Sequence, residues 1–165
     1  SVQLAQFTSL EKLTNLNETM SVLPTYLSSF ANAQMVNLIG NEALAKGNVI
    51  DVNSTSAKIS YKLPSSIANA TISVFDVNGA QVDTVKVGNQ ESGINTVTWN
   101  CGNVTPGQYS FAISASDQSG RAVTADTLIS GMVTGTSFKG SVAYLTINGR
   151  EVAFSNVVAI NKASN

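Results

Sequence analysis

The stretch Val142–Phe154, with the sequence VAYLTINGREVAF, decides the fold class of this chain. An Asn-Gly pair between alternating apolar residues is the strongest short-range signal for a β-hairpin with a two-residue type I′ turn. The pairs that such a turn predicts are Ile147 with Arg150, Leu145 with Val152 and Ala143 with Phe154. Their apolar members share one face, as a hairpin half-buried on a core requires. The sequence therefore predicts a mostly β protein.

A second hairpin is predicted over Thr71–Val85, around Asn78-Gly79. A three-residue loop with Gly79 in the left-handed region would set Val74 opposite Val82, whereas a two-residue turn would set Phe75 there. We favour the first alternative because it also brings Ile72 to the core face.

Further strands are predicted where short β-branched and aromatic runs follow Pro, Gly and Asn punctuation. They cover Ala57–Leu63, Ile94–Trp99, Gln108–Ala115 and Arg121–Leu128. Their spacing is typical of a small β-sandwich. The Gly-rich stretch 131–140 lacks the spacing of a phosphate-binding loop and is interpreted as a flexible β-connection. Within it, buried packing is expected for Met132 and Phe138 rather than exposed contact.

The N-terminal part of the chain has helical rather than strand periodicity, from Leu4 to Phe30. Its apolar residues alternate three and four apart and form a seam, which consists of Leu13, Leu16, Met20, Leu23, Leu27 and Phe30. Pro24 either kinks this helix or opens a second one. The seam is compatible with an amphipathic helix packed on its own domain and with contact to a partner chain.

Composition limits the functions open to this protein. Its 165 residues are 43% hydrophobic, which is ample for a core, but only 12% are charged. The net charge is -1 and the basic residues are scattered, so no nucleic-acid partner is expected. No apolar run is long enough for a transmembrane helix, so no membrane partner is expected either. Because residue 1 is Ser, we expect the sequence to begin inside a longer protein.

Catalytic chemistry has few candidate residues here. The chain has no histidine, which is the commonest general base and metal ligand, and its ten acidic residues are dispersed. Cys101 is the only cysteine, so no intramolecular disulfide is possible. Asp117 with Ser119-Gly120 lacks the further oxygen ligands of a calcium loop and is interpreted as a turn. We therefore expect no enzymatic activity, no cofactor and no metal.

Several segments together resemble the flagellar hook-capping family, the scaffold proteins at the growing end of the bacterial flagellar hook. The similar segments are Gln3–Leu13 with Asn15–Asn17, Ala33 with Leu38–Gly40, Trp99–Gly102, Pro106–Phe111 and Leu145–Val152. They follow the family's order and span nearly the whole chain. One departure is Asn100-Cys101, which stands where the family usually has a single Asp.

The resemblance implies a fibronectin-type-III-like sandwich inserted into a small Tudor-like β-barrel and preceded by an N-terminal helix. The implied division is a helical segment over residues 1–35, a discontinuous barrel over 36–55 and 128–162, and a sandwich over 56–127. The resemblance also implies a cap that is exported through the flagellar export apparatus to the extracellular hook tip. Its partners would be hook protein subunits and further copies of itself, and the seam is the predicted contact surface.

Two other classes of function compete with this interpretation. An adhesin or carbohydrate-binding sandwich would use Trp99, Tyr109 and Tyr144 for stacking on sugars, although Trp99 and Tyr109 lie in alternating strands that favour the core. An enzyme would need a cleft holding two close carboxylates. A row of exposed aromatic side chains would favour the adhesin, and paired carboxylates would favour the enzyme.

Overall fold

The computed structural model describes residues 16, 20, 29, 31 and 33–163, which are mostly β. The described residues of the N-terminal region that are helical are 16, 20, 29, 31 and 33–36. The strands are β1 (Glu42–Lys46), β2 (Val49–Val52), β3 (Ser56–Leu63), β4 (Asn69–Phe75), β5 (Gln81–Val87), β6 (Gly93–Asn100), β7 (Gly107–Ser116), β8 (Ala122–Val123), β9 (Asp126–Lys139), β10 (Val142–Ile147), β11 (Arg150–Ala153) and β12 (Val157–Asn161), with a 3-10 turn at η1 (Phe154–Asn156).

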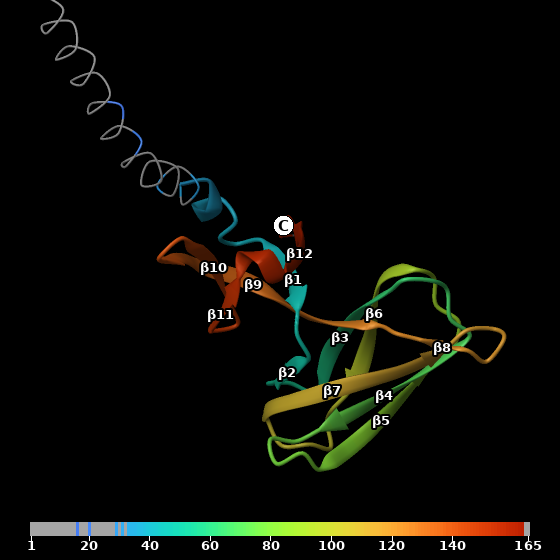
Figure 1. The fold of residues 1–165 in the computed structure, drawn as a ribbon. Helices are drawn as coiled ribbons and strands as arrows, with labels where there is room; N and C mark the ends of the chain where they lie inside the picture. Colours follow the sequence, from blue (N-terminus) through green and yellow to red (C-terminus); the bar gives the residue numbers. More distant parts are fainter. Residues whose placement is uncertain (1–15, 17–19, 21–28, 30, 32, 164–165) are drawn as a thin grey trace, which may run out of the picture.

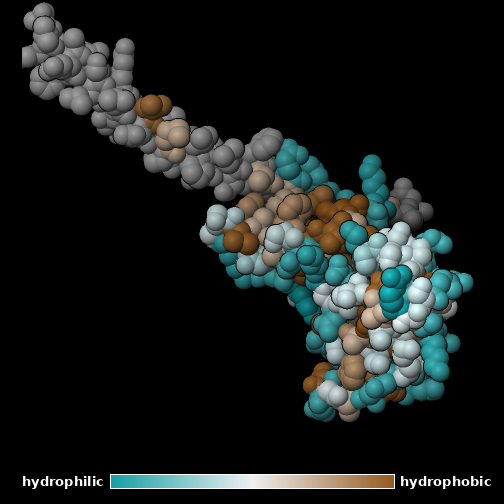
Figure 2. All heavy atoms as spheres, turned by 45° about the vertical axis from the view of Figure 1, so that its right-hand side comes forward, coloured by the Kyte–Doolittle hydropathy of each residue, from teal (hydrophilic) through white to brown (hydrophobic). Residues whose placement is uncertain are grey.

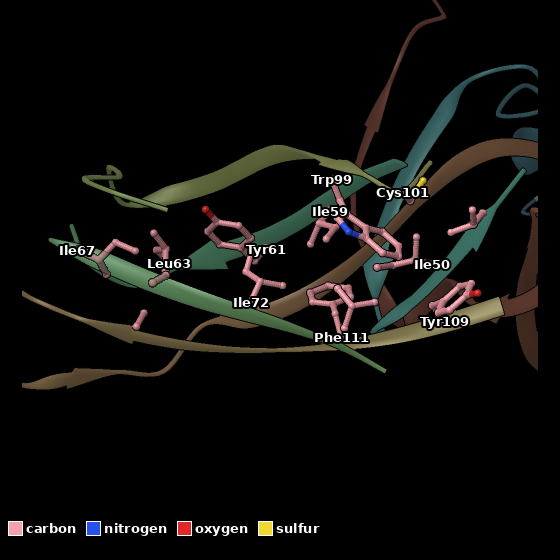
Figure 3. Close-up of a cluster of buried hydrophobic side chains, with 14 residues drawn as sticks. Ile50, Ile59, Tyr61, Leu63, Ile67, Ile72, Trp99, Cys101, Tyr109 and Phe111 are labelled. Atoms are coloured by element: carbon pink, nitrogen blue, oxygen red, sulfur yellow. The ribbon is translucent and has the colours of Figure 1, made fainter. Parts of the chain in front are cut away.

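Strands β2 to β8 build a two-layered sandwich, which we call the sandwich lobe. One layer has the order β2-β7-β4-β5 with β8 beside β7, and the other contains β3 and β6. Alternating side chains of β4 point inward and are buried, as a period of two residues requires. Figure 3 shows the side chains between the layers. This core consists of Ile50, Val52, Ile59, Tyr61, Leu63, Ile67, Ala70, Ile72, Val74, Trp99, Cys101, Tyr109, Phe111 and Ala115.

A second lobe, which we call the barrel lobe, is formed by the curved sheet β11-β10-β9-β1-β12 (Figure 1). It has its own core of Met35, Ala43, Ala45, Val133, Leu145, Ile147 and Val152. Met35 belongs to the helical turn that precedes β1, so the end of the N-terminal helix packs against this lobe. Two separate cores therefore stabilise the two lobes.

Strand β9 belongs to both lobes. Its first residues pair with β3, as in Tyr61 with Thr127, and its later residues pair with β1 and then with β10. Figure 1 shows β9 running from one lobe into the other. The interpretation of residues 131–140 as a flexible connection was therefore wrong, because most of this stretch is a continuous strand. Gly131 lies opposite Ala43, and Gly135 lies opposite Thr146.

The hairpin predicted from Asn148-Gly149 is confirmed in its turn and its register. Asn148 has φ 51° and Gly149 has φ 77°, the two positive values that a type I′ turn needs. Ile147 pairs with Arg150, and Leu145 pairs with Val152. The expected pairing of Phe154 does not form, because the chain leaves the strand at η1. Phe154 is 43% exposed rather than buried.

The β4–β5 hairpin has the expected three-residue loop but a different register. Gly79 has φ 84°, and the backbone N–H of Asp76 donates to the carbonyl of Ala80. A bulge after the loop then sets Val74 opposite Asp83 rather than Val82. Because residues opposite each other share a face, the bulge turns Asp83 toward the core. There its carboxylate accepts a hydrogen bond from the indole N–H of Trp99 at 2.7 Å, which satisfies the buried donor.

Two further boundaries differ from expectation. Residues 49–52 were assigned to the barrel, but β2 pairs with β7, and Ile50 belongs to the sandwich core. The strand expected over Arg121–Leu128 is interrupted, since β8 is short and β9 begins at Asp126. The strands expected over Ala57–Leu63, Ile94–Trp99 and Gln108–Ala115 are confirmed within one residue at each end.

Candidate assembly surface

The predicted contact surface is the helical seam, of which the structure describes two members. Leu16 is 56% exposed and Met20 is 58% exposed, although both are large apolar side chains in helical residues. The other members, which are Leu13, Leu23, Leu27 and Phe30, lie outside the described residues. Leu16 and Met20 are thus available for contact with another chain.

The stripe of the seam extends into the barrel lobe. In the sequence, Ala31 and Met35 follow Leu27 at intervals of four residues, the spacing that a pattern of one helical face predicts, and Leu38 lies in the turn three residues after Met35. Met35 is 7% exposed, and Leu38 packs against the same core. The barrel lobe therefore covers the stripe at its C-terminal end, while Leu16 and Met20 stay uncovered.

An open apolar groove lies where the helix meets the barrel lobe. Its volume is about 630 Å³, and its lining consists of Ala31, Gln34, Met35, Leu38, Phe138, Ser141, Ala143 and Phe154. Figure 2 shows apolar side chains gathered on the barrel lobe near the end of the helix, whereas the sandwich surface in this view is largely polar. Within the described part of the chain, no charged side chain lines the groove.

Further apolar side chains are exposed near the start of β1. Met132 is 54% exposed, so the expectation of buried packing was wrong for this residue. Met132 lies in β9 opposite Glu42 of β1 and points outward, whereas the next residue in the strand, Val133, is buried. Phe138 is partly buried against the barrel core, as expected. Sequence reasoning could not separate the two residues because it treated their stretch as a loop.

The aromatic residues proposed for sugar stacking are not an exposed row. Trp99 is 1% exposed and Tyr109 is 8% exposed, and their rings meet edge to face with centroids 5.8 Å apart. The Tyr109 hydroxyl donates to the carbonyl of Thr105 at 2.7 Å, as in a tyrosine corner. Tyr144 is half-buried, with the Lys139 ammonium 5.6 Å from its ring centre. Trp99 and Tyr109 therefore stabilise the sandwich core.

The polar groups of the described residues form turns and ion pairs. Asp117 accepts backbone N–H bonds from Ser119 and Arg121 and pairs with the Arg121 side chain. The backbone N–H of Arg121 is the main cause that lowers the pKa of this carboxyl. The segment is a turn, as expected. Among the described residues, no three His, Cys, Asp or Glu side chains gather closely enough to bind a metal ion, and no described helix could span a membrane.

Among the described residues, one charge contact joins the two lobes directly. The Arg150 guanidinium, at the start of β11, binds the Asp51 carboxylate in β2 with N–O distances of 3.0 and 2.7 Å. The two residues are separated by 99 positions in the chain, so no local pattern in the sequence could have indicated this pair. They line a cleft of about 220 Å³ between the lobes, together with Lys58, Ser130 and Asn148 among others.

Known proteins are similar to this chain in sequence and in fold. The FlgD Ig-like domain family matches residues 47–119. The basal-body rod modification protein FlgD of Escherichia coli (strain K12) is 27% identical over 128 residues, which are 70% of this chain and 55% of that protein. The protein of the same name from Buchnera aphidicola subsp. Schizaphis graminum (strain Sg) is 23% identical over 160 residues, 88% of this chain and 71% of that protein. The chain is therefore similar to FlgD proteins in sequence along most of its length. It spans about half the length of the Escherichia coli relative.

Solved FlgD structures have a similar fold. The crystal structure of FlgD from P. aeruginosa has a TM-score of 0.61 at 26% identity and covers 75% of this chain and 98% of that one. The structure of FlgD from Xanthomonas campestris, described as giving insights into the hook capping essential for flagellar assembly, has a TM-score of 0.68 at 19% identity. It covers 78% of this chain and 98% of that one. FlgD structures thus share the β architecture seen here.

Proposed function

We propose that this chain is a member of the FlgD family and a non-catalytic scaffold that caps the growing flagellar hook and supports the polymerisation of hook protein subunits there. The observation that carries the proposal is the relationship to a basal-body rod modification protein FlgD along 88% of the chain. The structure of FlgD from Xanthomonas campestris, whose fold is similar, is described as giving insights into the hook capping essential for flagellar assembly.

The uncovered part of the apolar stripe fits this task. A cap raises the local concentration of incoming subunits and orients them until they pack, which requires contact surface rather than a reaction centre. The barrel lobe covers the C-terminal end of the stripe, at Met35, and the apolar side chains of Leu16 and Met20 are exposed. We assign the seam, Leu13, Leu16, Met20, Leu23, Leu27 and Phe30, to contact with hook subunits or with further copies of the chain.

The proposal includes an architecture and a location. The sandwich lobe would be the fibronectin-type-III-like unit, inserted into the barrel lobe as the Tudor-like unit. Copies of the protein would assemble at the extracellular hook tip after passage through the flagellar export apparatus. The match of residues 47–119 to the FlgD Ig-like domain family and the two separate cores support this arrangement.

A charge placed on the exposed stripe tests the function. In a bacterium carrying the full-length gene, Leu16→Asp or Met20→Asp should leave the protein exported but the hook unassembled. Removing an apolar anchor from an interface costs about 2 kcal/mol or more of binding free energy, and a buried charge adds to that cost. Export is measured by immunoblotting of the culture medium, and hooks are counted by electron microscopy.

The matched control is Lys86→Ala, an exposed change on β5 of the sandwich lobe, which should leave hook number unchanged. Normal hooks in a strain that lacks the gene would refute the scaffold function itself. Normal hooks with both Leu16→Asp and Met20→Asp would remove the seam from the contact surface, while the scaffold function would remain.

A further inference from the structure

The two lobes are joined on one side by continuous backbone. Strand β9 passes through both, and β1 leads into β2 through Gly47 and Asn48. The backbone N–H of Gly47 donates to the carbonyl of Thr127 at 3.2 Å, so both connections cross between the lobes at the same place. A Cβ at Gly47 would lie 3.0 Å from the Ile129 side chain, which shows how closely they pack. Two adjacent crossings define a hinge line about which one lobe can tilt.

The Asp51–Arg150 ion pair joins the lobes separately from these crossings, through side chains rather than backbone. Figure 1 shows the β10–β11 hairpin pointing from the barrel lobe toward β2 of the sandwich lobe. Arg150 is the first residue after the turn of that hairpin, and its planar guanidinium holds both carboxylate oxygens of Asp51. A bidentate pair fixes direction as well as distance. The Asn148 side chain also donates to the Ser130 carbonyl at 3.0 Å, which holds the hairpin tip against β9.

We propose that the Asp51–Arg150 ion pair sets the angle between the two lobes and thereby controls the width of the cleft between them. The side chains of Arg150 and Asp51 are 31% and 36% exposed, so water and salt reach the pair. Exposed ion pairs are screened by salt. The angle between the lobes is therefore adjustable by ionic strength, and the cleft opens when the pair breaks. This inference does not depend on the proposed function.

The test measures the distance between the lobes with paired spin labels. The labels are attached at Val77→Cys, in the exposed β4–β5 loop, and at Ser155→Cys, in η1 of the barrel lobe. Cys101 is 1% exposed and stays unlabelled. Breaking the pair with Arg150→Gln should reduce the ratio of the closed to the open arrangement by about 1.4-fold to fivefold, the range for exposed ion pairs. The distance distribution should broaden accordingly.

Two further variants separate this effect from general destabilisation. Glu151→Gln removes a neighbouring ion pair, with Lys139, that lies wholly within the barrel lobe. It should leave the distance distribution unchanged. The exchange of both charges, Asp51→Arg with Arg150→Asp, should restore the narrow distribution that Arg150→Gln loses. Thermal unfolding confirms that each variant is folded.

Ionic strength provides an independent measurement. Raising salt should broaden the distribution of the unsubstituted chain and should leave that of Arg150→Gln unchanged, because that variant no longer has the pair. Identical distributions for the two proteins at low and high salt would overturn the proposal. The backbone crossings alone would then fix the angle between the lobes.

Discussion

Two buried tyrosines in the sandwich core differ in how their hydroxyl groups are satisfied. The Tyr109 hydroxyl donates to the Thr105 carbonyl. Tyr61 is fully buried, and its hydroxyl has no hydrogen-bond partner among the residues that the structure describes. Figure 3 shows Tyr61 between the layers, near Leu63 and Ile72. Leaving a buried polar group unpaired costs about 1–3 kcal/mol, so the Tyr61 ring stabilises the core while its hydroxyl opposes that gain.

Replacing Tyr61 by Phe should therefore keep or raise stability, by up to about 1 kcal/mol in the free energy of unfolding, because only the unpaired hydroxyl is removed. Tyr109→Phe is the matched control and should lower the free energy of unfolding by about 1 kcal/mol, since it removes a satisfied hydrogen bond. Urea unfolding at neutral pH measures both. A loss of stability in Tyr61→Phe as large as that in Tyr109→Phe would show that the Tyr61 hydroxyl has a partner.

Tyr61 also leads us to expect that the unsubstituted chain and Tyr61→Phe differ in stability at alkaline pH. Burial raises the pKa of the Tyr61 phenol above its ordinary value near 10. The unfolded chain therefore loses this proton first, and stability falls as the pH rises from about 10 toward the raised pKa. The free energy of unfolding, measured across this pH range, should fall less steeply with pH for Tyr61→Phe than for the unsubstituted chain. Equal slopes would mean that the Tyr61 phenol is accessible to water.

At the scale of elements, strand β9 has a glycine, Gly131, at a position where the turn of the β10–β11 hairpin leaves no room for a side chain. A Cβ on Gly131 would lie 2.5 Å from both the amide nitrogen and the amide oxygen of Asn148. Because that amide donates to the Ser130 carbonyl, it cannot move without losing its hydrogen bond. The close approach explains why a residue without a side chain occupies an interior strand position.

Gly131→Ala should lower the free energy of unfolding by about 1–2 kcal/mol, the sum of a displaced side chain and a lost hydrogen bond. Gly135→Ala is the control on the same strand, since its Cβ would lie 3.5 Å from Thr146 and should be tolerated. In a chain that already carries Asn148→Gly, Gly131→Ala should cost little. Thermal unfolding of the four variants measures this, and an equal cost in both backgrounds would show that Asn148 is not the obstacle.

A feature of a strand can be predicted from the sequence when the residues that cause it are close together in the chain, and not when they are far apart. The Asn148-Gly149 hairpin was predicted in register because its turn chemistry and its alternation are local. The bulge at Val82 was missed because its cause is distant, namely the need of the buried Trp99 N–H for the Asp83 carboxylate. The exposure of Met132 depends in the same way on a pairing with β1, far away in the chain.

At the scale of the whole molecule, the division into lobes depends on pairings that no local pattern contains. The resemblance to a family predicts the inserted arrangement, whereas periodicity predicts only a series of strands. Even so, β2 was placed in the wrong lobe, because four residues between two turns carry no sign of which sheet they join. Of the candidate surface, the sequence pattern includes the exposed residues Leu16 and Met20, whereas no pattern indicates the Asp51–Arg150 pair.

If the sandwich lobe is an inserted unit, the barrel lobe should fold without it. Residues 48–126 are the appropriate segment to remove, because β2 belongs to the sandwich and Lys46 pairs with Leu128 across the gap. The hydrogen bond from Gly47 to Thr127 brings the two ends together, so a short Gly-Ser linker can join them as a hairpin.

We expect the shortened chain to unfold cooperatively, at a lower temperature than the whole protein, because the removal exposes Leu128 at the junction. Its retained core includes Val133, Leu145 and Ile147, each at most 1% exposed, which supplies the apolar burial for a small independent lobe. Leu145→Asp in the shortened chain is the control and should abolish folding, since it places a charge in that core. Calorimetry and the dispersion of amide resonances measure both chains. A shortened chain with no cooperative transition and no dispersed spectrum would mean that the shared strand β9 makes the two lobes one folding unit.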